Sequence, residues 1–168
     1  MKKLTIGFSK AKSKRAILSH LIRKIEDTPY SHVYVKFHSD SLDRDIVYQA
    51  SKTMVNFVGL QKFNEESETV EAYTLDLNDE VYRHILQYAI DNAGKPYGIK
   101  GLIGKGVQRL ARLFGWKIKN PFKDGSSTYI CFELVGIILW IIGMIDSGED
   151  LESMDLKTFH DLFVKGLK

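Results

Sequence analysis

The apolar residues of this chain change their spacing near residue 78, and this change limits the possible folds more than any other feature of the sequence. Before that point, apolar and polar residues mostly alternate, as they do in strands with one buried face. After it, apolar residues recur every three or four positions, as they do along one face of a helix. Strands in one block followed by helices in another predict an α+β fold. The length of 168 residues suits one domain, which we assign to residues 1–168.

The alternating segments define the expected sheet. Its strands cover Leu4–Phe8, His32–Phe37, Asp45–Ala50, Thr53–Phe63 and Thr69–Leu77. Most connections are short, so we expect a meander of antiparallel strands. Between the first two strands, a polar turn at Ser9–Lys14 precedes an amphipathic helix at Ala16–Ile25.

Further helices are expected in the second half of the chain. Asn78 is a suitable N-cap for a helix at Val81–Ala93, and a final helix at Leu156–Leu167 begins near Asp155. Another helix lies in the apolar run Ile130–Ile145, which is shorter than the roughly 18–20 residues of a membrane-spanning helix. We therefore interpret this run as a buried core helix.

Cys131 is the only cysteine of the chain. A single thiol excludes an internal disulfide and a multi-cysteine metal site, and the acidic residues and histidines show no metal-ligand spacing. After Met1-Lys2-Lys3, the apolar stretch is too short for a signal peptide. We therefore expect a cytoplasmic protein without a metal or another cofactor.

Cys131 follows the polar residues 125–128 at the head of an apolar helix, where the positive end of the helix dipole lowers a thiol pKa from its ordinary value of about 8.5. His32 opens an expected strand and can accept the thiol proton. Gln49, on the next strand, can orient the imidazole through its amide oxygen, with His38 and Asp40 as weaker alternatives. The plain alternative is that Cys131 is a small core residue and His32 a structural one.

Four short motifs carry a family resemblance: His32-Val33-Tyr34-Val35, Val47-Tyr48-Gln49-Ala50, Gly94-Lys95-Pro96-Tyr97 and Cys131-Phe132-Glu133-Leu134-Val135. Together they resemble the NlpC-type papain-like superfamily. In the common order of that superfamily the histidine strand follows the cysteine helix, whereas here it precedes it. The chain is therefore similar to the circularly permuted branch, the YiiX/YaeF-like group, and more distantly to lecithin:retinol acyltransferase-like enzymes. The resemblance spans about residues 28–140 and implies an antiparallel papain-like sheet packed against a helical layer that carries the cysteine helix.

The resemblance implies that Cys131 is the nucleophile, His32 the general base and Gln49 the third catalytic residue, at a position where relatives often carry Glu. It also implies that Tyr97 lies near the cysteine and that Tyr34, where relatives often carry Gly, narrows the substrate site. The implied activity is hydrolysis or acyl transfer through a thioester, at an amide or ester bond of a cell-wall peptide or lipid. Gln cannot offset the charge of an imidazolium, so a non-catalytic relative that binds lipid or peptidoglycan fragments is the alternative.

The net charge of +3 is unevenly distributed, because residues 1–25 and residues 95–123 each hold eight Lys or Arg and no acid. Such segments attract anionic partners. In the second segment, apolar and basic residues separate onto two faces of an expected helix at 103–114 that precedes Trp116, a pattern typical of a helix on a membrane surface. The alternative, which we slightly favour, is an ordinary amphipathic helix packed on the core. We count an anionic membrane surface as a candidate partner, beside a small-molecule, lipid or peptide substrate. Nucleic acid is less favoured, although a basic membrane-surface or nucleic-acid-binding protein with a core cysteine stays open.

Overall fold

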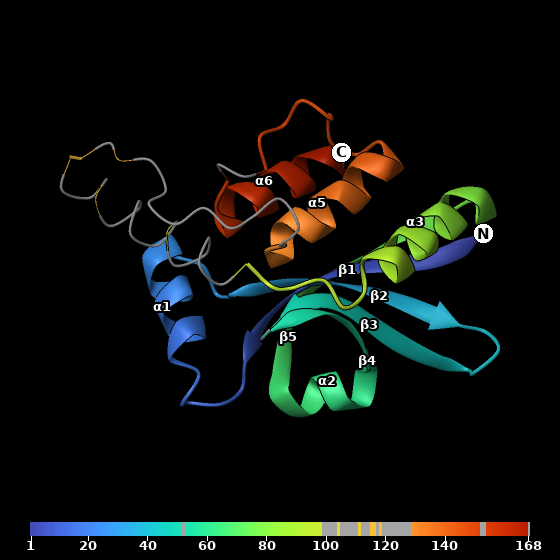
Figure 1. Ribbon diagram of the computed structural model, residues 1–168, viewed down its shortest axis with the longest axis horizontal. Helices are drawn as coiled ribbons and strands as arrows, with labels where there is room; N and C mark the ends of the chain where they lie inside the picture. Colours follow the sequence, from blue (N-terminus) through green and yellow to red (C-terminus); the bar gives the residue numbers. More distant parts are fainter. Residues whose placement is uncertain are drawn as a thin grey trace.

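A computed structural model describes residues 1–51, 53–98, 104, 111, 115–116, 118, 129–151 and 154–167. It confirms the expected α+β fold: a five-stranded antiparallel sheet in the order β4-β3-β2-β1-β5, with helices on both faces (Figure 1). The strands are β1 Lys2–Ala11, β2 His32–Ser39, β3 Arg44–Ser51, β4 Met54–Gly59 and β5 Ser67–Leu77. The helices are α1 Ile17–Glu26, α2 Leu60–Glu66, α3 Asp79–Asn92, α5 Cys131–Ile142 and α6 Leu156–Gly166.

The main core lies between the sheet and the layer of α3, α5 and α6 (Figure 1). Alternate residues of β1 and β2 enter it, as the period of two in their sequences predicts, and all of them are buried: Leu4, Ile6, Phe8, Val33, Val35 and Phe37. Helix α5 is apolar on most of its surface because it packs between the sheet and α6. The interpretation of Ile130–Ile145 as a core helix is thus confirmed, although α5 itself ends at Ile142 with Gly143 at a left-handed φ.

Two helix starts are capped as the sequence predicts. The Asn78 side chain accepts a hydrogen bond of 2.8 Å from the Val81 backbone N–H at the start of α3. The Asp155 side chain accepts one of 2.8 Å from the Thr158 N–H at the start of α6. These caps fix the start points of α3 and α6.

The expected strand Thr53–Phe63 is wrong in its second half. β4 ends at Gly59, and Leu60–Glu66 form helix α2, which covers the other face of the sheet (Figure 1). Phe63 of α2 packs with Tyr34 and Val47 in a second, smaller core. The chain turns into a helix here because Phe63 is buried against that face of the sheet, a tertiary contact that local alternation does not reveal.

β1 is also longer than expected, because residues 9–11, assigned to a turn, continue the strand. They pair with Thr69, Glu68 and Ser67 of β5. β5 thus closes the second edge of β1 instead of extending the meander beyond β4.

Gly7 and Tyr34 are paired across β1 and β2, and the Tyr34 ring lies directly over the Gly7 Cα. A Cβ at position 7 would come within 2.2 Å of the Tyr34 ring. The position therefore requires glycine for close approach rather than for a special backbone conformation.

In the part of the chain that the structure describes, no helix is both long and apolar enough to cross a bilayer. Of the expected helix at 103–114, the structure describes only residues 104 and 111. Its apolar face of Ile103, Val107, Leu110 and Phe114 lies outside the described residues, as do the polar residues 125–128, whereas Trp116 is described and exposed.

Candidate active site

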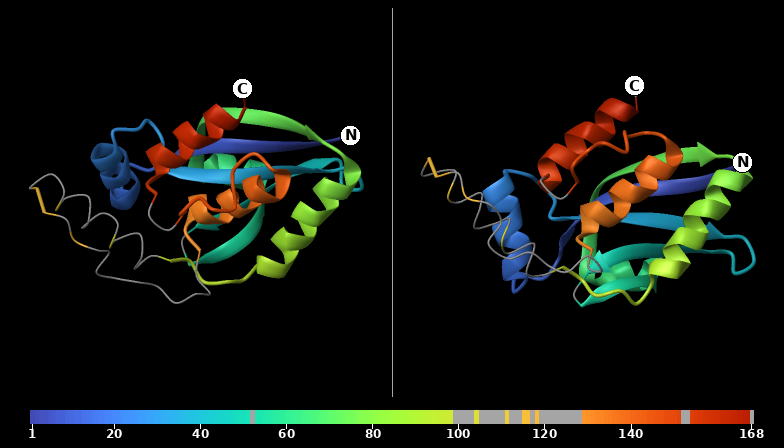
Figure 2. Two further views of the ribbon diagram at one scale, coloured as in Figure 1. Left: turned by 90° about the horizontal axis from the view of Figure 1, so that it is seen from above. Right: turned by 45° about the horizontal axis from the view of Figure 1, so that its top comes forward.

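Cys131 is the first residue of α5, which begins over the start of β2 (Figures 1 and 2). No side chain at the N-cap, Ile130, supports this helix start. Instead the Glu133 carboxylate turns back and accepts a hydrogen bond of 3.0 Å from the Ile130 backbone N–H. The residue that stabilises the helix start therefore also brings a negative charge close to the thiol.

The Gly94-Lys95-Pro96-Tyr97 segment joins β4 to the residues just before α5. The Val55 N–H of β4 donates to the Lys95 carbonyl over 2.8 Å. On the other side, Tyr97 forms a parallel bridge with Tyr129, and the Gly98 N–H donates to the Tyr129 carbonyl over 3.0 Å. These backbone bonds anchor Tyr129, two residues before Cys131, to the sheet.

His32, the first residue of β2, is held by Gln49 of β3. His32 Nε2 and Gln49 Oε1 lie 2.9 Å apart. Since a side-chain amide oxygen only accepts hydrogen bonds, Nε2 carries the proton and Nδ1 of the neutral ring is left as a base. Burial lowers the pKa of His32 to about 4, and the contact with Gln49 only partly opposes this shift. His32 is therefore neutral at pH 7.

The pKa of the Cys131 thiol shifts in the opposite direction to the one expected from the sequence. Burial raises it to about 12, and the nearby Glu26 and Glu133 carboxylates add to the rise. The Val33 backbone N–H donates a hydrogen bond to the sulfur and lowers the pKa, but the burial effect is larger. The site therefore holds a neutral thiol and a neutral imidazole rather than a thiolate–imidazolium pair.

The thiol and the imidazole approach the start of β2 from two sides. Pairing between β2 and β3 begins at Val35↔Tyr48, so Val33 precedes the part of β2 that pairs with β3, and its N–H donates to the sulfur. The His32 side chain alternates with Val33 and extends away from the main core toward Gln49. Both residues are described, and the structure contains no hydrogen bond between the Cys131 thiol and the His32 ring. Only the backbone between His32 and Val33 links the two groups directly.

The two tyrosines predicted for the site occupy different places. Tyr97 pairs with Tyr129, two residues before Cys131, and burial raises the pKa of its hydroxyl, with smaller contributions from the charges of Cys131 and Glu133. Tyr34 instead points toward α2, where its hydroxyl and Thr69 Oγ1 are 2.8 Å apart and its ring packs on Phe63. The expectation that Tyr34 narrows the site of Cys131 is therefore wrong, because β2 alternates and Cys131 belongs to the other core.

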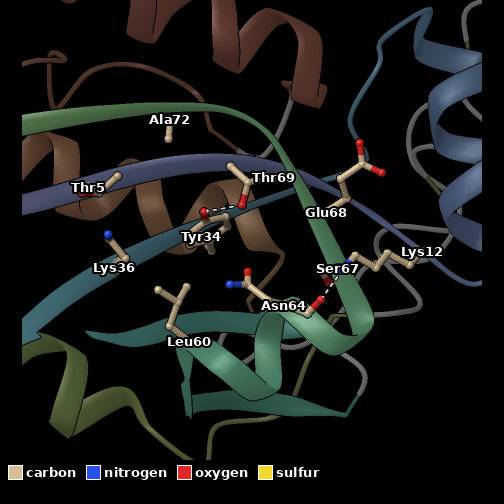
Figure 3. A pocket seen from close by; sticks show the side chains of 10 residues that line it. All are labelled: Thr5, Lys12, Tyr34, Lys36, Leu60, Asn64, Ser67, Glu68, Thr69 and Ala72. Atoms are coloured by element: carbon tan, nitrogen blue, oxygen red, sulfur yellow. Dashed lines mark hydrogen bonds between the residues drawn. The ribbon is translucent and has the colours of Figure 1, made fainter. Parts of the chain in front are cut away.

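Tyr34 borders a shallow groove of about 510 Å³ on the α2 side of the sheet (Figure 3). Its lining residues are Thr5, Lys12, Tyr34, Lys36, Leu60, Asn64, Ser67, Glu68, Thr69 and Ala72. Each charged side chain in this groove already has a partner: Lys36 pairs with Asp45, Glu68 pairs with Lys10, and Lys12 donates to the Asn64 carbonyl. The groove lies on the α2 side of the sheet, whereas Cys131 belongs to the main core on the other side.

The weaker alternatives for the orienting role lie away from His32. His38 lies toward the opposite end of β2, where its Nδ1 is 3.0 Å from the Asp45 carboxylate, and Asp40 pairs with Lys2. Gln49 is therefore the residue that orients His32.

The sequence reading missed Glu133 and the Val33 N–H as parts of the site. Glu133 has a recognisable signal, because a Glu three residues after a helix N-cap commonly bonds back to the backbone. A backbone N–H that contacts a sulfur from a distant strand leaves no signal in the residue types.

No protein-family model matches the chain, and a search of curated proteins gives no match.

Proposed function

We propose that this protein is a cysteine-dependent hydrolase or acyltransferase of the permuted NlpC-type papain-like kind, acting on an amide or ester bond. One observation carries the proposal: the start of β2 supplies both the Val33 N–H that contacts the Cys131 sulfur and the His32 ring that Gln49 orients. A nucleophile, a base and an orienting group within one short stretch of structure are the parts that covalent acyl transfer needs.

The reaction starts from a neutral pair. The Cys131 sulfur attacks the carbonyl carbon of the substrate while its proton passes to His32 Nδ1, and the C–N or C–O bond then breaks as His32 protonates the leaving group. Water, or another hydroxyl or amine, attacks the thioester with His32 as base and releases the acyl group. In this structure the His32 ring extends away from the main core that contains Cys131, so the proposed reaction requires the start of β2 to turn His32 toward the sulfur when substrate binds.

The tetrahedral intermediate needs hydrogen-bond donors for its oxyanion. The Cys131 backbone N–H lies at the start of α5 and has no acceptor within the helix. The Tyr97 hydroxyl, whose pKa is raised by burial, is the second donor in this proposal, because Tyr97 pairs with Tyr129, two residues before Cys131. Gln49 keeps the imidazole oriented but adds no charge to stabilise the imidazolium.

Acylation of Cys131 is the direct test. The protein is incubated with p-nitrophenyl esters of short and long fatty acids and with peptide amides, and the intact mass and the modified residue are read by mass spectrometry. We expect an acyl adduct on Cys131 that His32→Ala slows by about 100-fold or more. His38→Ala, which changes the exposed histidine of the same strand, is the matched control and leaves the rate unchanged. Equal hydrolysis by wild type and Cys131→Ala, with no adduct on Cys131, would end the proposal.

A second candidate is a non-catalytic protein of the same fold that binds lipid or peptidoglycan fragments. Cys131 is only 4% exposed and its thiol pKa is raised to about 12, which suits a core cysteine. In that case the Cys131→Ala variant retains full ligand binding and no substrate leaves an adduct. We place either activity in the cytoplasm, where a lone thiol stays reduced.

A further inference from the structure

Helix α1 exposes its apolar face to solvent. Ile17, Leu18 and Leu21 are 78%, 40% and 48% exposed, and no residue of this ten-residue helix is buried. An amphipathic helix of a globular protein normally turns this face toward the core. The helix lies at one end of the sheet, beside the layer of α5 and α6 (Figure 2).

Polar groups hold α1 in this orientation. Ser19 Oγ lies 2.6 Å from Ser31 Oγ, and the Ala11 backbone N–H donates to Ser19 Oγ over 3.4 Å. On the same side, Ile22 packs on the edge of the main core. Because Ser19 lies on the opposite side of the helix from Ile17 and Leu21, these contacts keep the apolar residues directed outward.

The surroundings of this face are basic. Lys12, Lys14, Arg15 and Lys24 are exposed, and residues 1–25 contain no acid. The acids Glu26 and Asp27 lie at the C-terminal end of α1, where Glu26 accepts a hydrogen bond from the Leu156 N–H. Within the described part of the chain, no ion pair involves Lys14, Arg15 or Lys24. The aliphatic face and its cations together match the two layers of a bilayer surface, apolar chains below anionic headgroups.

We propose that α1 binds an anionic lipid surface, with Ile17, Leu18 and Leu21 inserted between headgroups and Lys14, Arg15 and Lys24 in contact with phosphates. The charge complementarity favours lipid over a protein partner, because a protein groove for this helix would need to present acidic groups on both flanks of an apolar slot. Binding does not require Cys131 or its chemistry. Membrane binding through α1 would bring the end of the molecule that contains Cys131 toward the lipid. Glu26, at the end of α1, accepts a hydrogen bond from the Leu156 N–H, and its charge raises the pKa of the Cys131 thiol.

Vesicle co-sedimentation tests the proposal. The full chain is mixed with phosphatidylcholine vesicles, with and without about 30 mol % phosphatidylglycerol. We expect binding to the anionic vesicles only, lost as the salt concentration rises toward about 0.5 M. Ile17→Glu and Leu21→Glu each reduce the partition coefficient by about tenfold or more, and Lys14→Glu reduces it as well.

The controls carry the same changes at other exposed positions. Leu42→Glu alters an aliphatic residue that is 58% exposed in the turn after β2, and Lys165→Glu alters an exposed cation on α6. Both variants, and Cys131→Ala, are expected to bind like wild type, with folding checked by circular dichroism. Absence of binding, equal binding to neutral vesicles, or an equal loss in Leu42→Glu would overturn the proposal. Dimerisation abolished by Leu21→Glu, without vesicle binding, would assign the face to a second copy instead.

Discussion

The side-chain oxygen of Gln49 lies 2.9 Å from Nε2 of His32, and this contact determines which nitrogen of the imidazole is available as a base. It orients the ring without adding charge, so burial dominates and the pKa of His32 falls to about 4. An imidazole with this pKa is a weak base, but the ring is unprotonated across the whole neutral range, so its free nitrogen is available to accept a proton. The proposed chemistry therefore depends on moving the thiol proton during attack rather than on a preformed thiolate.

Replacing Gln49 by Glu adds the charge that the site lacks. A carboxylate beside Nε2 favours the protonated ring, so we expect Gln49→Glu to raise the pKa of His32 and to maintain or raise acyl-transfer activity. The imidazole titration is followed by NMR, and the acid limb of the rate profile moves to higher pH with it. Gln61→Glu, an exposed position on α2, is the control. Complete loss of activity in a folded Gln49→Glu protein would contradict the orienting role.

The lowered pKa of His32 makes the fold sensitive to acid. Its value is about 4 in the folded protein and 6.5 ordinarily, so between these pH values the unfolded chain binds a proton that the folded one does not. Stability is therefore lost as the pH falls from about 6.5 to about 4, by about 1–3 kcal/mol after allowance for the partly exposed ring. Urea unfolding at pH 7 and about pH 4.5 measures this loss. His32→Gln should reduce the loss by that amount, whereas a similar reduction in His84→Gln, at an exposed position on α3, would contradict the assignment.

The raised pKa of Cys131 predicts a thiol that reacts slowly in the folded state. Iodoacetamide alkylation should rise with pH along a curve whose midpoint lies well above the ordinary value of about 8.5. In urea the same thiol should react at the rate of a free cysteine. A midpoint below 8.5 in the folded protein would show that the electrostatics of the helix start outweigh burial, as the sequence alone suggests.

A substitution at Glu133 can distinguish the effect of helix capping from the effect of its negative charge on the thiol. Gln at this position keeps an oxygen for the Ile130 N–H but removes the carboxylate that raises the thiol pKa. We expect Glu133→Gln to lower the pKa of Cys131 and to speed alkylation at pH 8, with little change in stability. Glu65→Gln, on an exposed turn of α2, should leave the alkylation rate as it is. If Glu133→Gln also leaves the rate unchanged, the carboxylate does not act on the thiol.

Local patterns were enough to predict most of the fold. Alternation located β2 and β3, helical spacing located α3 and α6, and Asn78 and Asp155 marked the starts of those helices. The pairing of β5 with β1 and the turn of the chain into α2 depend on contacts between distant segments, such as Phe63 with Tyr34. No local rule encodes such contacts.

The site was predicted in part. The Gln49 contact with His32 follows from their places on neighbouring strands, and the structure contains it. The direction of the Cys131 pKa was wrong, because a helix start favours the thiolate only where burial and carboxylates do not oppose it. Burial and the nearby carboxylate of Glu26 depend on how α1 and α5 pack, which composition and spacing do not report.

The close approach of Gly7 and Tyr34 provides a test of the sheet itself. A methyl group at position 7 would lie 2.2 Å from the Tyr34 ring, so Gly7→Ala must displace a side chain that packs on Phe63 and reaches Thr69. We expect a loss of about 1–3 kcal/mol in the free energy of unfolding, measured in urea. Gly59→Ala is the control, because nothing lies within 4 Å of a Cβ there. Removing the ring should relieve the clash, so Gly7→Ala combined with Tyr34→Ala should cost less than the sum of the two single changes. Strict additivity would mean that the ring does not lie over position 7.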